Sequence, residues 1–387
     1  MKQIRPDYNP LYFLIALGAG GLSAAFFMYV NFMVPHKHVP MATFDFIYPA
    51  LMKGDWLSYV TAISLIFVIL FAFLHFKLLW WNLKEFAIYK KSAAYESMRT
   101  SNAEVTLLAI PLTLAMTINV MFVLGASFVP GLWDYIEYLL PGALLGFLAV
   151  GYYAFRIFSE YFTRLLINGD FDFGQNNSLS QMLSIFAFAM VAVGLAAPGA
   201  MSKIVVVNAI GIIAATFFMS LAVLLLIIKI VLGFKSMFKN GISAEAAPSL
   251  WIMIPILTLL GITLIRVKFG LDHHFEAQVP KAEFLTLSAT IVSLQVIFGA
   301  LGYSVMKRMG YFKTFVFGDK QSVPSFALIC PGVAFTVFWL FFVQFGLVLN
   351  GVVEKYSIWY FIVTVPILYI HYKTVYYFFK LKSHFAL

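Results

Sequence analysis

Long apolar runs alternate with short polar connectors along the whole chain of 387 residues. Ten of these runs are long enough to cross the hydrocarbon core of a bilayer, which takes about 20 residues in a helix. They lie near 11–33, 57–80, 104–128, 138–160, 179–199, 204–232, 249–267, 283–306, 325–349 and 357–379. No stretch between them has the length of a separate soluble domain. The pattern therefore predicts an all-α membrane protein with ten transmembrane helices in a single domain, 1–387.

Basic and aromatic residues cluster at the end of every second run, as in FKLLWWNLK and FRIFSEYFTR. The first basic residues of the five clusters are 66 to 79 residues apart; they are Lys77, Arg156, Lys229, Lys307 and Lys373. A regular spacing of this size indicates an internal repeat. We interpret the repeat as a helical hairpin of about 75 residues that is used five times.

Helix breakers mark the odd-numbered runs instead. Four of the five odd runs carry them within the apolar stretch: Gly18, Gly20 and Gly21, Pro111, Pro255, and Pro331 with Gly332. The remaining odd run, 179–199, has Pro198 only at its outer end. A proline in a spanning helix frees a carbonyl group that neighbours or water must satisfy, so breakers on every second helix favour one shared environment. We predict that the odd helices bend around a quasi-five-fold central pore and that the even helices face lipid. The alternative is that these prolines reflect only the general frequency of proline in membrane helices.

Charge is scarce and unevenly distributed. Only 11% of the residues are charged, whereas soluble domains carry about 25%. Of the 26 Lys and Arg residues, 19 fall on the side where the even-numbered runs end, which predicts that both termini are cytoplasmic in an inner or plasma membrane. The net charge of +9 is therefore attributed to topology and to contact with anionic membrane lipids, not to nucleic acid. The seven basic residues assigned to the outer side are Lys37, Lys53, Lys203, Arg266, Lys268, Lys281 and Lys355.

The acidic residues exclude several functional classes. All 17 Asp and Glu residues lie in predicted loops or within a turn or two of a predicted helix end, and no basic residue is predicted at a helix centre. Coupled transporters, proton relays and cation pores place carboxylates at membrane depth, so we expect none of these. An uncharged pore would select anions by their cost of dehydration and by the positive potential at its mouth. The runs also lack a catalytic constellation, so the sequence predicts neither an enzyme nor a bound cofactor.

Three short motifs add a resemblance to a known family. The first run, YFLIALGAGGLSAAFF, the third, AEVTLLAIPLTLAM, and the ninth, FALICPGVAF, resemble pore helices of the tellurite-resistance permeases, slow-type anion channels and malate–sulfite permeases. Gly18 and Ser23 match the family in the first run. The order and the basic ends of the ten helices agree over nearly the whole chain. The resemblance implies a homotrimer in which each protomer conducts anions passively.

The chain departs from the family pattern at two places. Before the third run it has RTSNAEV, without the family's His-Pro or Ser-Pro-x-Arg signature. In the ninth run the family places a phenylalanine plug directly before the kink, and here that position is Cys330, the single cysteine. One alternative is that Cys330 is a small apolar residue with an inert thiol. The other is that Cys330 leaves the pore wider, or that another side chain supplies the plug.

Several phenylalanines are candidates for that plug. Phe326 lies one turn before Cys330 on the same helix face, and Phe186 and Phe188 lie on the run 179–199. The complete set of predicted pore and gate residues is Gly18, Gly20, Gly21, Pro111, Phe186, Phe188, Pro255, Phe326, Cys330, Pro331 and Ala334.

Two groups of histidines lie in connectors predicted on the outer side. The groups are His36 with His38, and Asp272, His273, His274 with Glu276. Two histidines with carboxylates are a possible zinc set, but the spacing is not that of a metal motif, so we expect solvated loops and no metal. His75 and His371 lie near inner helix ends, where we expect them to anchor the interface.

Together these features predict a passive channel for small monovalent anions such as chloride and nitrate. The alternative is an exporter or permease for sulfite, tellurite or C4-dicarboxylates on the same fold, which only flux measurements separate. The expected partners are small inorganic anions, membrane lipids and further copies of the chain.

The charge bias makes the topology testable. A cysteine introduced at Ser92, in a connector predicted to be cytoplasmic, should react with a membrane-impermeant reagent only from the cytoplasmic side. Cysteines introduced within 36–54 should react only from outside. Labelling of position 92 from outside would contradict the predicted orientation.

Overall fold

The computed structural model describes residues 8–37, 39–174 and 176–387. Every regular element within these ranges is helical. Ten helical spans are long and apolar enough to cross a membrane, which confirms the number predicted from the apolar runs. Their main helices are α1 (Phe13–Met33), α3 (Trp56–Tyr89), α5 (Ala109–Phe128), α6 (Ile136–Asn168), α7 (Leu183–Met201), α8 (Val205–Asn240), α9 (Met253–Phe275), α10 (Lys281–Arg308), α11 (Ile329–Phe341) and α12 (Ile358–His384).

Shorter helical segments extend these spans and occupy three connectors. The 3₁₀ segments are η2 (Pro10–Tyr12), η3 (Asn102–Leu108), η4 (Leu132–Tyr135), η5 (Ser180–Met182), η6 (Ala247–Ile252) and η8 (Val323–Leu328). The π-helical segments are η7 (Phe312–Val316) and η9 (Phe342–Val348). Two short helices, α2 (Phe44–Met52) and α4 (Ala93–Arg99), lie in connectors for which the sequence analysis gives no helix.

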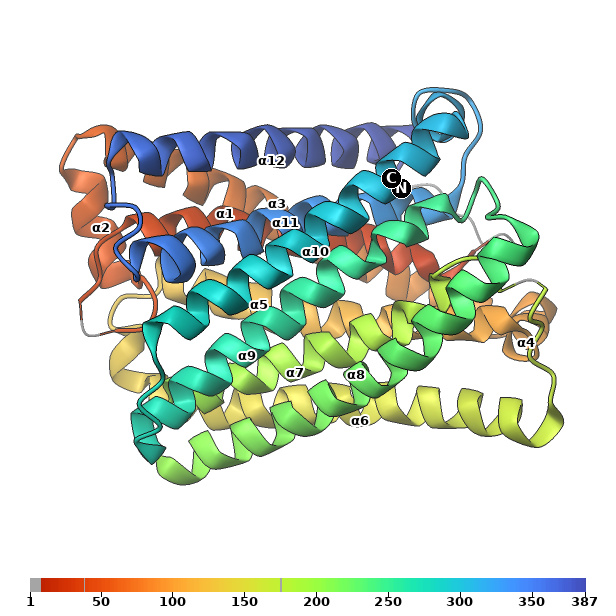
Figure 1. Ribbon diagram of the computed structural model, residues 1–387, viewed down its shortest axis with the longest axis horizontal. Coiled ribbons are helices and arrows are strands. Elements are labelled where there is room, and N and C mark those ends of the chain that lie inside the picture. Colours follow the sequence, from red (N-terminus) through yellow and green to blue (C-terminus); the bar gives the residue numbers. More distant parts are fainter. Residues whose placement is uncertain (1–7, 38, 175) are drawn as a thin grey trace.

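The long helices run along one common direction, with α2 at one end of the bundle and α4 at the other (Figure 1). The C-terminus lies at the end that carries α4 (Figure 1). The ring centroid of Phe385 there is 5.9 Å from that of Tyr12. A residue near the start of the described chain and one near its end therefore meet at this end of the bundle. An even number of spans returns a chain to the side where it started.

The ten spans differ in burial, and the difference alternates along the chain. In the spans of α1, α5, α7, α9 and α11, between 61 and 94% of the most apolar stretch is buried. In the spans of α3, α6, α8, α10 and α12 the share is only 28 to 50%. The five more buried helices contact one another in the order α1, α5, α7, α9, α11 and again α1, and each also packs against the less buried helix that follows it in the sequence.

Large apolar side chains project from the less buried helices. Phe73 and Trp80 on α3, Ile213 and Leu224 on α8, and Tyr369 on α12 are all more than half exposed. Water would penalise an apolar surface of this extent, whereas hydrocarbon does not. This surface is the one expected of a multi-pass membrane protein.

Prolines mark changes of helix type within three of the buried spans. Pro111, Pro255 and Pro331 are each the third residue of an α-helix that follows a 3₁₀ segment. At this junction the backbone N–H groups change their acceptor from the carbonyl of residue i−3 to that of residue i−4. Proline fits such a position because it has no backbone N–H that needs an acceptor. The prolines therefore stand at the start of α-helices and do not kink continuous ones.

The three glycines of the first span do not break it, contrary to the expectation from the sequence. α1 continues through Gly18, Gly20 and Gly21 without interruption. A Cβ atom at Gly18 would lie 2.7 Å from Cγ2 of Ile329 on α11, and one at Gly20 would lie 2.6 Å from Cγ of Met116 on α5. Glycine is needed at these positions because neighbouring helices approach the backbone of α1 closely.

A second close approach joins α7, α8 and α9 through three glycines. A Cβ atom at Gly211 would lie 2.7 Å from the backbone nitrogen of Gly199, and one at Gly270 would overlap the backbone oxygen of Gly199. The side-chain amide of Asn208 donates to the same oxygen of Gly199. Because backbone atoms cannot rotate out of the way as side chains can, this contact tolerates no larger residue.

We therefore expect Gly270→Ala to lower the thermal unfolding temperature of the detergent-solubilised protein. Overpacking of this kind costs about 1–3 kcal/mol or more. Gly142→Ala in α6 is the matched control, because no atom lies within 4 Å of its Cβ position, and alanine favours a helix by up to about 1 kcal/mol over glycine. Equal unfolding temperatures for the two variants would contradict the close approach.

Candidate functional site

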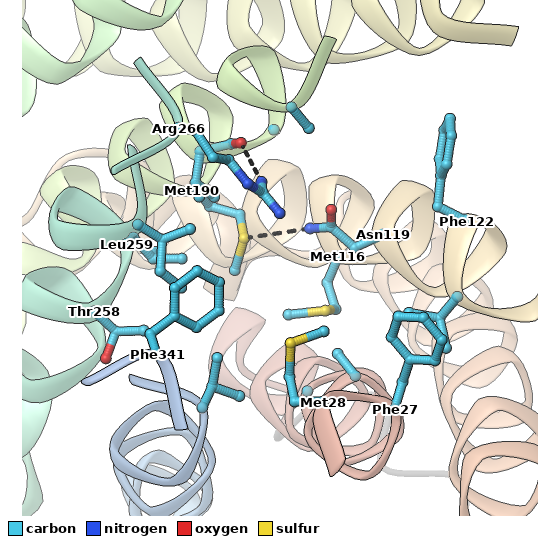
Figure 2. A pocket seen from close by; sticks show the side chains of 18 of the residues that line it. Phe27, Met28, Met116, Asn119, Phe122, Met190, Thr258, Leu259, Arg266 and Phe341 are labelled. Carbon is cyan, nitrogen blue, oxygen red and sulfur yellow. Dashed lines mark hydrogen bonds between the residues drawn. The ribbon is translucent and has the colours of Figure 1, made fainter. Parts of the chain in front are cut away.

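A cavity of about 520 Å³ lies among the five more buried helices. Residues of α1, α5, α7, α9 and α11 line it, and α6 contributes Leu140, Ala143 and Phe147. It extends from Phe186 and Cys330 toward the end of the bundle where Pro40 and Met201 lie. Figure 2 shows the middle of this cavity, where Met28 and Met116 project toward its centre.

The wall of the cavity is almost entirely apolar. The polar residues in it are Asn31, Asn119, Thr258 and Arg266, and no Asp or Glu lines it within the described ranges. Asn31 accepts a hydrogen bond of 2.9 Å from the amide of Ala42. Thr258 donates to backbone carbonyl groups of α9 and α11. Asn31 and Thr258 are therefore each engaged with the backbone, and the remaining polar residues of the wall are Asn119 and Arg266.

Arg266 places a positive charge in this wall. Its Nη1 donates to the backbone oxygen of Val193 at 2.8 Å, and no described carboxylate lies within ion-pair distance of it. The sequence analysis assigned Arg266 to the outer side because the apolar run ends near 267, but α9 continues to Phe275. Arg266 is thus the fourteenth of the 23 residues of α9, so the expectation that no basic residue lies at a helix centre is wrong.

Asn119 reaches the cavity from α5, close to Arg266. Its amide nitrogen makes a weak hydrogen bond of 3.7 Å to the sulfur of Met190. Met190 and Val193 are one turn apart on α7, so Asn119 and Arg266 bond to the same turn of that helix. Figure 2 shows both polar side chains pointing toward this part of the cavity.

A smaller cavity of about 60 Å³ adjoins the large one at the end where Phe186 and Cys330 lie. Leu14, Thr106, Ala327 and Pro331 are among its lining residues. Three residues line both cavities, namely Phe186, Pro255 and Cys330. These three residues lie where the two cavities adjoin, and we refer to them as the partition.

The predicted site residues divide into two groups. Those that line a cavity are Gly18, Gly21, Phe186, Pro255, Cys330, Pro331 and Ala334. Those that line neither cavity are Gly20, Pro111, Phe188 and Phe326. The four polar residues of the large cavity, Asn31, Asn119, Thr258 and Arg266, were not singled out as a site by the sequence analysis. The only signal for Arg266 was an arginine at the end of a long apolar run, which is also typical of an interfacial residue.

The two phenylalanines outside the cavities pack between helices. Phe326 is fully buried, and its ring centroid lies 5.7 Å from that of Tyr12 and 4.7 Å from that of Phe385. Phe188 is also fully buried and contacts Phe158 and Phe218. The hypothesis that Phe326 plugs the pore does not fit this packing, and Phe186 is the candidate aromatic side chain at the partition.

Other polar side chains are buried between helices away from the cavities. His75 contacts the backbone oxygen of Ala16 at 2.8 Å and the hydroxyl of Thr117 at 2.9 Å. His371 contacts the hydroxyl of Tyr29 at 3.0 Å. Both histidines link helices within the bundle, so the expectation that they anchor helix ends at the interface is wrong. Lys229 is likewise bonded within the bundle, to the backbone oxygen of Gln181.

An ion-pair network holds the segment where the chain departs from the family pattern. Glu104 is almost fully buried, and its carboxylate contacts Arg99 and Arg164 at 2.9 Å each. Arg99 also contacts Glu160 on α6 at 3.1 Å. The network ties α4, η3 and α6 together, and the loss of one partner of such a buried pair costs about 3–5 kcal/mol.

The histidine groups show no metal geometry among the described residues. Asp272, His273 and His274 lie on the last turn of α9 and not in a loop, and His274 contacts the backbone oxygen of Ser202 at 2.8 Å. Burial lowers the pKa of His36, whose Nδ1 contacts the backbone oxygen of Val34 at 2.8 Å. No cluster of three or more His, Cys, Asp or Glu side chains is placed to hold a metal in the described ranges; His38 lies outside them.

Comparison of the chain with protein-family models and with curated proteins finds no match in either case. The resemblance drawn from the three motifs therefore stays a prediction.

The partition can be tested through Cys330, the single cysteine. A small neutral thiol reagent added from the side of the large cavity should modify it, because Cys330 lines that cavity. Phe186→Ala should accelerate the reaction, since it widens the space beside the thiol. Phe188→Ala removes an equal side chain from the helix contacts outside the cavities and should leave the rate unchanged. An unreactive Cys330 in all three proteins would contradict its exposure to the cavity.

Proposed function

We propose that the protein is a passive channel for small monovalent anions in a cell membrane, with both termini cytoplasmic. The pore is formed by α1, α5, α7, α9 and α11, arranged with quasi-five-fold symmetry from five helical hairpins. The observation that carries the proposal is the pair of adjoining cavities among the spans of these five helices, which share Phe186, Pro255 and Cys330 as lining residues.

The charge of the cavity wall supports anions as the conducted species. Arg266 is the single charged residue among those that line the large cavity. A positive charge in an apolar space with no counterion attracts a mobile anion and repels cations, and the low local dielectric strengthens both effects. A cation would find no carboxylate there to replace its hydration shell.

The lack of titratable partners along this path supports passive movement. Coupling to protons commonly uses a carboxylate or a histidine at membrane depth, and none lines either cavity within the described ranges. Each anion would then move down its own electrochemical gradient. The proposal includes no catalytic step.

Phe186 is the proposed gate. The related channels place a phenylalanine where this chain has Cys330, and Phe186 faces the same partition from α7. The aromatic ring would block the path by its bulk and by excluding water. The small side chain of Cys330 would leave the ring of Phe186 room to move aside. Assembly as a homotrimer, with lipid around it, rests on the family resemblance alone.

Reversal potentials under bi-ionic conditions in a planar bilayer test the proposal. We expect nitrate and iodide to be more permeant than chloride, with sulfate least permeant, because a narrow apolar path favours anions that lose water easily. A bilayer without protein is the control. A cation-selective reversal potential, or a preference for sulfate over nitrate, would rule the proposal out.

The alternative function gives a different result. An exporter or permease on this fold would move labelled sulfite, tellurite or a C4-dicarboxylate across vesicle membranes while chloride and nitrate carry no current.

A further inference from the structure

We propose that Arg266 and Asn119 form a binding site for one small monovalent oxyanion with parallel acceptor oxygens, of which nitrate is the simplest probe. The site lies in the large cavity, on the turn of α7 that holds Met190 and Val193. The inference deepens the proposed function. Its conductance measurements rest on that function, whereas its binding measurements do not.

The guanidinium of Arg266 has donors to spare. An arginine carries five N–H donors in a planar fork, and the hydrogen bond from Arg266 to the oxygen of Val193 uses one of them. Arg266 is half-buried and lines the large cavity. Figure 2 shows its side chain pointing into that cavity. A cation in an apolar cavity wall whose bonded partner is a neutral carbonyl group lacks charge compensation, which a bound anion would supply.

Asn119 supplies a second donor from the opposite helix. Its amide nitrogen is engaged only with the sulfur of Met190 at 3.7 Å, and a thioether is a weak acceptor. Exchanging this contact for a charged oxygen strengthens the bond, because hydrogen bonds to ionised groups are about twice as strong as neutral ones. Since Arg266 and Asn119 bond to one turn of α7, an anion beside that turn would receive donors from both α5 and α9.

The shape and charge of the site define the ligand class. The fork of a guanidinium fits two oxygens of one planar anion with two parallel hydrogen bonds, which a spherical halide cannot accept. One positive charge balances one negative charge, and the neighbouring Met28, Met116, Phe122 and Phe341 add no further charge. A dianion would keep an uncompensated charge in an apolar space. Nitrate therefore fits better than chloride or sulfate.

Selection among anions would have two separate origins, the cost of dehydration and binding by the guanidinium of Arg266. Dehydration favours iodide and nitrate alike over chloride, whatever lines the path. The fork of Arg266 favours nitrate alone. Arg266→Lys keeps the charge and a donor for the oxygen of Val193 but loses the fork, so it should lower the preference for nitrate over chloride and leave the preference for iodide over chloride unchanged.

The experiment combines equilibrium binding with conductance. In the purified protein, chloride exchanging with a site broadens the chloride NMR line, and nitrate that displaces it restores the narrow line. In bilayers, the nitrate concentration at half-maximal conductance is measured for the same proteins. The variants are Arg266→Gln, Arg266→Lys and Asn119→Ala. The matched control is Lys268→Gln, which removes an equal charge two residues along α9, from a lysine that pairs with Glu283 and does not line the cavity.

We expect Arg266→Gln to raise the nitrate concentration needed for displacement and for half-maximal conductance by about tenfold or more, as for the loss of a hydrogen bond to a charged group. Asn119→Ala should raise both severalfold, and Lys268→Gln should change neither. Arg266→Lys and Asn119→Ala are verified as folded if they elute from a size-exclusion column at the same volume as native protein and have the same unfolding temperature.

The outcomes distinguish this site from the proposed function. Nitrate displacement that is equal in native protein, Arg266→Gln and Arg266→Lys overturns the site, even if the protein conducts anions. Displacement that depends on Arg266 in a protein that carries no current upholds the site and overturns the channel. If Lys268→Gln raises the nitrate concentration for displacement as much as Arg266→Gln does, the site is also overturned. Positive charge near the cavity would then explain both results.

Discussion

A backbone in hydrocarbon has to satisfy its hydrogen bonds within its own segment, and the rest of this structure depends on that constraint. It makes every described regular element a helix. It also decides where the helices depart from regular α geometry. The 3₁₀ segments before α5, α9 and α11 lie in the buried spans, where neighbouring helices rather than lipid surround the altered backbone. Three of the inner spans can therefore change helix type among their neighbours, whereas among the outer spans only that of α6 begins with a described 3₁₀ segment, η4.

The ten spans were predictable because hydropathy and length depend only on local sequence. The outer spans extend beyond the predicted ends by several residues, as α8 does by continuing to Asn240, since basic and aromatic side chains allow a helix to leave the apolar layer. The alternation of burial was predictable from the positions of glycine and proline, but the reason was partly wrong. Gly20 is small because Met116 and His75 approach it, and not because α1 bends there.

The chemistry of the cavity was harder to predict, because it depends on which way each side chain points. Cys330 and Phe186 could be proposed from their positions, whereas the burial of Phe326 depends on Tyr12 and Phe385, which are distant in sequence. The place of Arg266 in the cavity wall was missed because an arginine at the end of an apolar run has the same sequence pattern whether it faces an interface or a cavity. An arginine that contacts a carbonyl group of a different helix, as Arg266 does with Val193, can be recognised only once the helices are assembled.

The contact of Phe326 with Tyr12 and Phe385 has a consequence for the order of biosynthesis. The ring of Phe326 joins a residue near the start of the chain to one near its end, at the place where α1 meets α11. A ribosome delivers these segments at opposite ends of translation, so the first helix waits in the bilayer while the eight intervening spans are inserted. The space among the inner helices is enclosed only when the ninth span arrives, and the last helix then secures it. A chain that lacks its ninth span therefore has the cavity open on one side, because α11 supplies part of its wall.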